Sequence, residues 1–155
     1  MAPADERFRT RAAALGIEVD ARRFPEGTRT ATDAARAVGC DVAQIVKSLV
    51  FIADDQPVLA LTSGANRVDE AKLATVVGAE QVRKASAAEV RDATGYAIGG
   101  TPPFGHDRQL TVLCDRDLAA QEVVWAAAGT PMDVFALPAD RLVQAAGARV
   151  VDLAG

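Results

Sequence analysis

The sequence has little of what builds metal sites or disulfide frameworks. It contains one histidine, His106, and two cysteines, Cys40 and Cys114, in 155 residues. One histidine excludes a multi-histidine metal site, and the two cysteines lack the CxxC or Cys/His spacing of a zinc site. Cys114 lies in an apolar run, where the expected role is that of a small buried side chain. We therefore expect a protein that works without a metal or other cofactor.

Long apolar runs and an excess of basic charge are also missing. No apolar stretch reaches the roughly 20 residues that span a membrane, and residues 1–6 lack the basic and apolar regions of a secretory signal. We therefore expect a cytoplasmic protein with no membrane partner. The 17 basic and 21 acidic side chains give a net charge of −4. This charge argues against nonspecific coating of nucleic acid, although it allows a local basic patch.

What is present is the composition of a folded globular domain. Half of the residues are hydrophobic and a quarter are charged, which excludes a disordered or collagen-like chain. A chain of this length buries roughly 70% of the surface that its unfolded form exposes, which is enough for one core and too little for two. We therefore expect a single domain over residues 1–155.

The spacing of apolar residues predicts helices and strands in alternation. Apolar periodicity, capping residues and glycine stops predict helices at 5–15, 31–38, 68–77, 87–93 and 138–146. Alternation and apolar runs predict strands at 17–24, 46–53, 57–63, 81–84, 109–114, 133–137 and 149–153. The pattern predicts a helical turn at residues 41–45 and a hairpin turn at residues 54–56. Residues 118–128 fit either a strand or a helix. The pattern indicates a mixed α/β or α+β domain with at least one antiparallel hairpin.

One segment has unusually restricted backbone chemistry. It reads Gly99-Gly100-Thr101-Pro102-Pro103-Phe104-Gly105-His106 and is called the glycine-proline loop below. Its glycines allow positive φ angles or close approach of a ligand, while its prolines exclude a helix or a central strand. Adjacent N–H groups in such a turn can form a small anion-binding nest. The same composition also fits a rigid connector, and both interpretations stay open.

A lysine begins the most apolar strand of the chain. Alternation along residues 46–53 places Lys47, Leu49 and Phe51 on one face. A partly desolvated ammonium there would bind a phosphate or polarise a carbonyl, whereas the alternative is a strand-end lysine that extends into solvent. His106 is a weak candidate for a general base, because no orienting carboxylate is identified. No nucleophile elbow, Walker loop or dinucleotide fingerprint is present, and no standard hydrolytic triad is visible.

Two segments together resemble the YbaK/EbsC family, relatives of the prolyl-tRNA synthetase editing domain. The segments are residues 44–51, which include Lys47, and residues 94–106, which include the glycine-proline loop; the likeness extends over roughly residues 8–153. The resemblance implies an α+β fold with a curved mixed β-sheet surrounded by helices. It also implies a free-standing trans-editing deacylase, which hydrolyses the ester that links a wrong amino acid, cysteine or alanine, to the tRNA for proline.

The resemblance also implies which residues form the site. Lys47 matches a lysine that the family needs for activity, and the glycine-rich loop shapes the aminoacyl pocket. We expect Lys47 and Gly100 to be the catalytic positions. Lys47 would bind the terminal phosphate or polarise the ester, and backbone groups of residues 99–101 would stabilise the oxyanion, with water or a substrate group as the nucleophile. The expected substrate-binding residues are Gly99, Thr101, Pro102, Pro103, Phe104, His106, Thr30 and Ser48.

One departure from the family bears on the amino acid rather than on the reaction. The chain has Thr101-Pro102-Pro103 where cysteine-editing members commonly carry a serine before a single proline. Pro102, Pro103 and Phe104 are expected to stiffen the walls of a small pocket that separates amino acids by size, because binding alone distinguishes one methylene by only about 1–3 kcal/mol.

The expected partner is the acceptor end of a mischarged tRNA, with prolyl-tRNA synthetase as a second candidate partner. Basic residues that would bind the tRNA are Arg22, Arg23, Arg29, Arg67 and Lys72. Two other functions stay open, a noncatalytic tRNA- or synthetase-binding module and a hydrolase of small amino-acid esters. The oligomeric state is open as well. The editing hypothesis requires Lys47 and the glycine-proline loop to face each other across a cavity.

Overall fold

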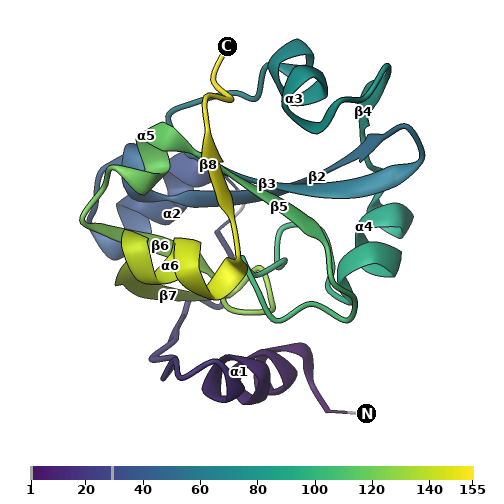
Figure 1. Ribbon diagram of the computed structural model, residues 1–155. Coiled ribbons are helices and arrows are strands. Elements are labelled where there is room, and N and C mark those ends of the chain that lie inside the picture. Colours follow the sequence, from purple (N-terminus) through teal and green to yellow (C-terminus); the bar gives the residue numbers. More distant parts are fainter. Residues whose placement is uncertain (1, 29) are drawn as a thin grey trace.

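Two β-sheets form the framework of the computed structural model, which describes residues 2–28 and 30–155 (Figure 1). The larger sheet has the strand order β4-β2-β3-β5-β8. Its strands are β2 (Val46–Ala53), β3 (Gln56–Ser63), β4 (Val82–Lys84), β5 (Thr111–Asp115) and β8 (Arg149–Val151). β2 pairs antiparallel with β3 and β4, whereas β3 with β5 and β5 with β8 are parallel pairs, so this sheet is mixed.

The smaller sheet is antiparallel and has the order β1-β7-β6. Its strands are β1 (Arg22–Arg23), β6 (Val123–Ala127) and β7 (Asp133–Pro138). An isolated parallel bridge between Ile45 and Trp125 connects the two sheets where β2 begins. This connection matters for the site, because it brings β6 next to the start of β2.

Helices surround the sheets, and their ends follow from local sequence. They are α1 (Ala4–Ala14), α2 (Ala31–Val38), the 3₁₀ turn η1 (Val42–Gln44), α3 (Glu70–Val77), α4 (Ala87–Thr94), α5 (Arg116–Ala119) and α6 (Ala139–Ala146). Thr30 caps α2 by accepting a hydrogen bond from the backbone N–H of Asp33, and Gly39 ends the helix with φ 78°. Ser86 and Glu89 form the capping box predicted for α4.

The two larger of three apolar clusters among the described residues lie on opposite faces of the larger sheet. One lies between the sheets and includes Leu59, Leu61, Val124 and Phe135. The other lies on the α3 side and includes Phe51, Leu73, Leu113 and Leu153. Alternate residues of β2 and β3 enter alternate clusters, because side chains of a strand point to opposite faces.

The predicted α+β class is confirmed, and the structure adds that the strands divide over two sheets. The five predicted helices and all but one of the predicted strands agree with the observed ranges to within two residues. The hairpin turn is formed by Asp54 and Asp55, both with positive φ. Residues 118–128, which fitted either a strand or a helix, contain the end of α5 and all of β6. Cys114 is buried, as expected.

The strand predicted at 17–24 is wrong except for its end. Only Arg22 and Arg23 pair with another strand, β7. Ile17 is buried and Val19 packs against the core, so the alternation of apolar and polar residues is present in the packing. A ladder also needs a neighbouring strand, and among the described residues none lies beside 17–21.

The outer edge of β2 is only partly covered. β4 pairs with Phe51–Ala53 alone, so in the described part of the chain no strand of the larger sheet lies beside residues 46–50 on that side. The Val50 carbonyl accepts the Ala85 N–H on this outer side. Because backbone groups alternate in direction along an antiparallel strand, the N–H and C=O of Ser48 also point outward, away from β3.

Among the described residues, no helix is long and apolar enough to cross a membrane.

Candidate functional site

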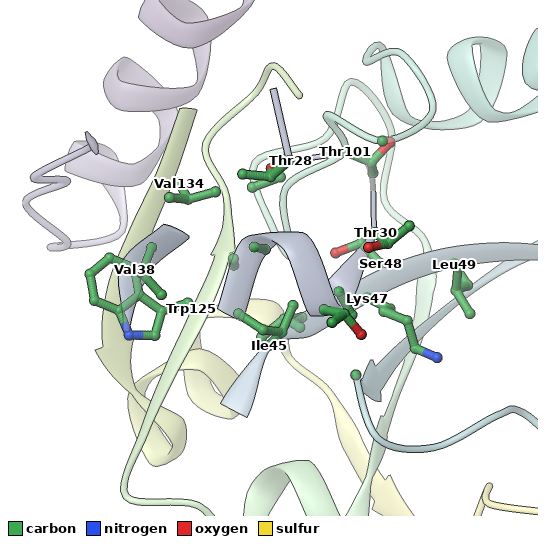
Figure 2. A pocket seen from close by; sticks show the side chains of 18 of the residues that line it. Thr28, Thr30, Val38, Ile45, Lys47, Ser48, Leu49, Thr101, Trp125 and Val134 are labelled. Carbon is green, nitrogen blue, oxygen red and sulfur yellow. The ribbon is translucent and has the colours of Figure 1, made fainter. Parts of the chain in front are cut away.

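A cavity of about 540 Å³ opens along the uncovered half of β2 (Figure 2). This volume lies within the usual range for small-molecule sites. Its walls come from α2 and the segment before it, the first half of β2, the start of the glycine-proline loop, and β6 and β7. In Figure 2, Trp125 and Val38 lie towards one end, and Lys47 and Leu49 lie towards the other.

Lys47 is half-buried at the edge of this cavity, and its ammonium is partly desolvated. Its Nζ donates a hydrogen bond to the backbone carbonyl of Asn66. Burial lowers the pKa of Lys47 below its ordinary value of 10.5, and the nearby charge of Arg67 lowers it further, while Asp115 opposes the shift. An ammonium in this setting interacts with an anion more strongly than one in bulk water does.

A buried carboxylate holds the segment that carries the partner of Lys47. Asp115 is fully buried. Its Oδ2 accepts from the backbone N–H of Ser63 at 3.1 Å and from Nδ2 of Asn66 at 2.9 Å. The same amide nitrogen donates to Asp117 at 2.8 Å. No sequence pattern indicated Asn66 or Asp115, because they are 49 residues apart and no motif connects them.

The glycine-proline loop reaches the cavity with its first residues. Gly99 and Thr101 line the cavity together with Lys47, so the structure brings the loop and the lysine to one space. Gly99 has φ +83°, a backbone conformation that residues other than glycine rarely adopt. The Thr101 hydroxyl donates to the Ala97 carbonyl at 3.1 Å, which closes the turn.

Gly100 lies in the same turn, but it is buried and is not among the residues that line the cavity. Its N–H donates to the Ala97 carbonyl at 3.0 Å, so in this structure that N–H is engaged and not free for an oxyanion. A Cβ at Gly100 would lie 2.8 Å from the Cα of Thr130. Glycine at this position therefore allows the loop to pack against the segment that begins at Gly129.

The rest of the loop lies behind the cavity wall. Pro102, Pro103, Phe104 and His106 do not line the cavity. The Phe104 ring is 2% exposed and contacts Phe8 and Phe135, with centroid distances of 5.4 and 6.2 Å. His106 Nε2 lies 2.7 Å from the Pro102 carbonyl oxygen, and burial lowers its pKa. In this structure these side chains support the loop and do not form the cavity surface.

Thr30 and Ser48 both line the cavity. The Thr30 hydroxyl is already used as the cap of α2, at 3.0 Å from the Asp33 nitrogen. The Ser48 Oγ differs, because it is buried and has no hydrogen-bond partner among the described residues.

Several lining residues carry no sequence signal. Trp125 is half-buried in the cavity wall, and the guanidinium of Arg22 lies 5.0 Å from the centre of its ring. Thr28 donates to the Pro131 carbonyl at 3.0 Å. Ile98 is 59% exposed at the cavity edge. Most of the remaining wall is apolar and consists of Ala31, Ala34, Val38, Ile45, Val46, Leu49, Ala126, Ala127 and Val134.

The basic residues proposed for tRNA binding differ in their surroundings. Arg23 pairs with Asp133 and Lys72 with Asp152, each at 3.1 Å. Arg67 is exposed near Lys47 and makes no ion pair with a described residue. Lys84 also lies near Lys47, although it was not among the residues expected to bind tRNA. Arg29 lies outside the described residues.

No group of three or more His, Cys, Asp or Glu among the described residues is placed to hold a metal ion.

Comparison with known proteins relates this geometry to a family. Residues 25–145 match the model of the aminoacyl-tRNA editing domain. A proline–tRNA ligase of Ligilactobacillus salivarius (strain UCC118) is 38% identical over 90 residues, which are 58% of this chain and 16% of that protein. A proline–tRNA ligase of Lactococcus lactis subsp. lactis (strain IL1403) is 31% identical over 109 residues, or 70% of this chain and 17% of that protein. The chain thus spans less than a fifth of these curated relatives.

Solved structures match over the whole chain. The crystal structure of a candidate trans-editing enzyme for prolyl-tRNA synthetase has a TM-score of 0.93 and 42% identity, with coverage of 100% of this chain and 99% of that one. The hypothetical protein APE2540 has a TM-score of 0.87 and 27% identity, with coverage of 96% and 99%.

Proposed function

This chain belongs to the aminoacyl-tRNA editing domain family, and we propose that it is a trans-editing deacylase that hydrolyses the ester between a wrong amino acid and the tRNA for proline. Cysteine and alanine are the amino acids proposed from the sequence. The proposal extends over residues 1–155 as one catalytic domain. Because aminoacyl-tRNA is the substrate, the proposed place of action is the cytoplasm.

One observation carries the proposal. The Lys47 side chain and the first residues of the glycine-proline loop, Gly99 and Thr101, line the same cavity of about 540 Å³. The sequence hypothesis required a cavity between these groups, large enough for an amino acid and its ribose. A filled space between them would have contradicted it.

The proposed role of Lys47 is electrostatic. Its ammonium leaves the Asn66 carbonyl and binds the terminal phosphate or polarises the ester carbonyl. Burial strengthens this interaction, because less water competes for the charge. Asn66 and Asp115 are proposed as positioning residues, since the hydrogen bond between them holds the segment whose carbonyl accepts from Lys47.

The proposed role of the loop is to hold the ester carbonyl. Backbone groups of Gly99 and Thr101 position the carbonyl oxygen and stabilise the negative charge that develops on it. Removal of one such donor in other enzymes raises the barrier by about 3 kcal/mol. The engaged N–H of Gly100 leaves that residue a steric role in this mechanism. Because an aminoacyl ester is already activated, alignment of a water molecule or of a substrate hydroxyl with the carbonyl supplies much of the rate enhancement.

Basic charge at the cavity edge supports an acidic substrate. Lys47, Arg67 and Lys84 lie near enough to one another that the charges of the other two lower the pKa of Lys47. Such a cluster would bind phosphates of the single-stranded acceptor end, where ribose and base are accessible. Prolyl-tRNA synthetase is proposed as a further partner on the basis of the relatives alone.

The decisive experiment is a deacylation assay with tRNA for proline charged with alanine, cysteine or proline. We expect hydrolysis of the mischarged forms and little hydrolysis of the prolyl form. Lys47→Ala is expected to lower kcat/KM on the order of a hundredfold, because it removes the ammonium from the reacting ester. Arg141→Ala is the control, since Arg141 is exposed on α6 and bonds the Gly16 carbonyl, away from the cavity lining.

The same assay separates the two other functions. A noncatalytic binding module would bind tRNA without hydrolysis, and its binding would not depend on Lys47. A hydrolase of small esters would act on alanine methyl ester as well as on alanyl-tRNA. Full activity of Lys47→Ala would contradict the electrostatic role of its ammonium.

A further inference from the structure

Ser48 lines the cavity, and its hydroxyl is buried without a hydrogen-bond partner among the described residues. Its Oγ has under 1 Å² of accessible surface and no partner among the described residues. A buried hydroxyl without a partner is costly, and such groups in native proteins call for an explanation. The residue itself is only partly buried and lines the cavity. Rotation about its single side-chain torsion therefore offers the hydroxyl to a bound molecule.

Three other hydroxyls of the same cavity have partners. Thr28 donates to Pro131, Thr30 accepts from Asp33, and Thr101 donates to Ala97. These three hydroxyls hold the wall together. The Ser48 hydroxyl makes no such hydrogen bond with a described residue, and much of the surface around the cavity is apolar. A ligand atom that bonds Ser48 would gain an interaction that the folded chain does not already supply.

Position along β2 indicates which part of the substrate meets Ser48. Side chains alternate along a strand, so Ser48 points to the face of Val46 and Val50, in the core between the sheets, whereas Lys47 points to the opposite face. Both residues line the cavity because it follows the uncovered edge of β2. A substrate whose phosphate or ester lies at Lys47 would therefore extend its small aminoacyl side chain past this edge towards Ser48.

We propose that Ser48 recognises a hydroxyl on the Cβ of the aminoacyl group, so that serine is the preferred amino acid and alanine a poor one. The inference rests on the proposed deacylase function and adds an amino acid to it. The serine hydroxyl both donates to and accepts from Ser48, whereas the thiol of cysteine is a weaker partner and the methyl group of alanine has none. Cysteine therefore takes an intermediate place.

The test compares seryl-, cysteinyl- and alanyl-tRNA for proline with the wild type, Ser48→Ala and Ser48→Thr. For the wild type we expect kcat/KM for seryl-tRNA to exceed that for alanyl-tRNA at least tenfold, since a site that bonds a substrate hydroxyl rejects the analogue without one. Ser48→Ala is expected to lower the seryl value about tenfold relative to the alanyl value, so that the preference for the seryl substrate is lost. Ser48→Thr, which keeps a hydroxyl, restores part of the preference.

A second measurement is independent of hydrolysis. The probes are adenosine derivatives that carry serine or alanine at the 3′ position through an amide, which is not hydrolysed. We expect tighter binding of the seryl probe to the wild type and equal binding of both probes to Ser48→Ala. Circular dichroism of each variant verifies that it is folded.

The outcomes separate this inference from the function on which it rests. If seryl and alanyl activities fall equally in Ser48→Ala, the hydroxyl contacts a part that all substrates share, and the inference is wrong. An unchanged seryl preference in that variant overturns it as well. If the wild type hydrolyses alanyl- but not seryl-tRNA, only this inference fails, whereas absence of hydrolysis for every mischarged tRNA refutes the deacylase itself.

Discussion

At the scale of single residues, the site depends on how the fold treats the charge of Lys47. The sequence places a lysine at the start of an apolar strand, and the fold removes part of its water and gives it a carbonyl partner, Asn66. Arg67 and Lys84 repel its proton, whereas Asp115 attracts it. Burial and the two cations prevail, so the pKa of Lys47 is lowered.

The first prediction concerns this titration. The pKa of Lys47 in the folded protein is below 10.5. Deacylation that depends on the ammonium therefore has its full rate at pH values below this lowered pKa, and the rate falls as pH rises through it. Arg67→Gln removes a neighbouring positive charge, so it moves the alkaline limb to higher pH. The measurement is kcat against pH after subtraction of spontaneous ester hydrolysis.

A direct titration provides the check on that assignment. The chain has three lysines, Lys47, Lys72 and Lys84, so lysine side-chain signals are few in a ¹³C-labelled sample, and Lys47→Arg identifies one of them. A Lys47 signal that titrates at or above 10.5 would show that its ammonium is not desolvated.

At the scale of elements, the glycine-proline loop is held from behind by α1 and by the segment 129–131. Arg7 and Arg11 of α1 donate to the carbonyls of Gly95 and Gly105 at 3.1 and 3.0 Å, and Phe8 packs on Phe104. Figure 1 shows α1 at one end of the molecule, below the β6–β7 pair. α1 precedes residues 25–145, which match the family model, so a helix outside that match supports the loop.

The second prediction tests this support through Gly100. Gly100→Ala brings a Cβ to 2.8 Å from the Thr130 backbone, which forces the loop away from its position. We expect a loss of about 1–3 kcal/mol in unfolding free energy, typical of overpacking, and a fall in kcat, because Gly99 and Thr101 move with the loop. Thermal unfolding and deacylation kinetics measure the two effects.

A glycine outside the cavity lining is the control for this substitution. Gly78 ends α3 with φ +71°, and a Cβ there meets nothing within 4 Å. Gly78→Ala is expected to lose roughly 1–2 kcal/mol through its left-handed backbone without a change in kcat. Equal kcat values for Gly100→Ala and the wild type would contradict the role assigned to the turn.

At the scale of the whole molecule, some basic side chains are neutralised by ion pairs and others are not. The net charge is −4, so attraction of an acidic tRNA cannot come from the protein as a whole. Several basic side chains are neutralised in ion pairs, as Arg23 is by Asp133. Lys47, Arg67 and Lys84 make no ion pair with a described residue and lie near one another at the cavity edge, so tRNA binding should depend on them.

The third prediction is therefore a shallow but measurable salt dependence. Three phosphate contacts to a single strand give a slope of about −2 for log(kcat/KM) against log salt concentration. The double variant Arg67→Gln, Lys84→Gln is expected to reduce the slope to about −1. Arg141→Gln, which removes an exposed charge from α6, serves as the matched control. A double variant with the slope of the wild type would place the tRNA elsewhere on the surface.

Much of the site could be predicted from the sequence because its main parts are local. The start of an apolar strand and a run of glycines before two prolines made Lys47 and residues 99–101 candidates, and the resemblance to the editing family selected them. Phe104 and His106 were expected at the substrate for the same reason, and they lie behind the wall. A loop sequence does not reveal which of its side chains face inward, since this depends on the elements packed against it.

Local sequence was sufficient to specify most of the helices and nearly all of the strands, because periodicity, caps and backbone restrictions act over a few residues. That Lys47 and the loop belong to one site came from the resemblance to the editing family. Long-range packing was needed to establish that β4 leaves half of β2 uncovered, that Asp115 holds Asn66, and that Ser48 keeps a hydroxyl without a partner among the described residues. These features arise from residues tens of positions apart, and their burial and pairing depend on how the two sheets pack together.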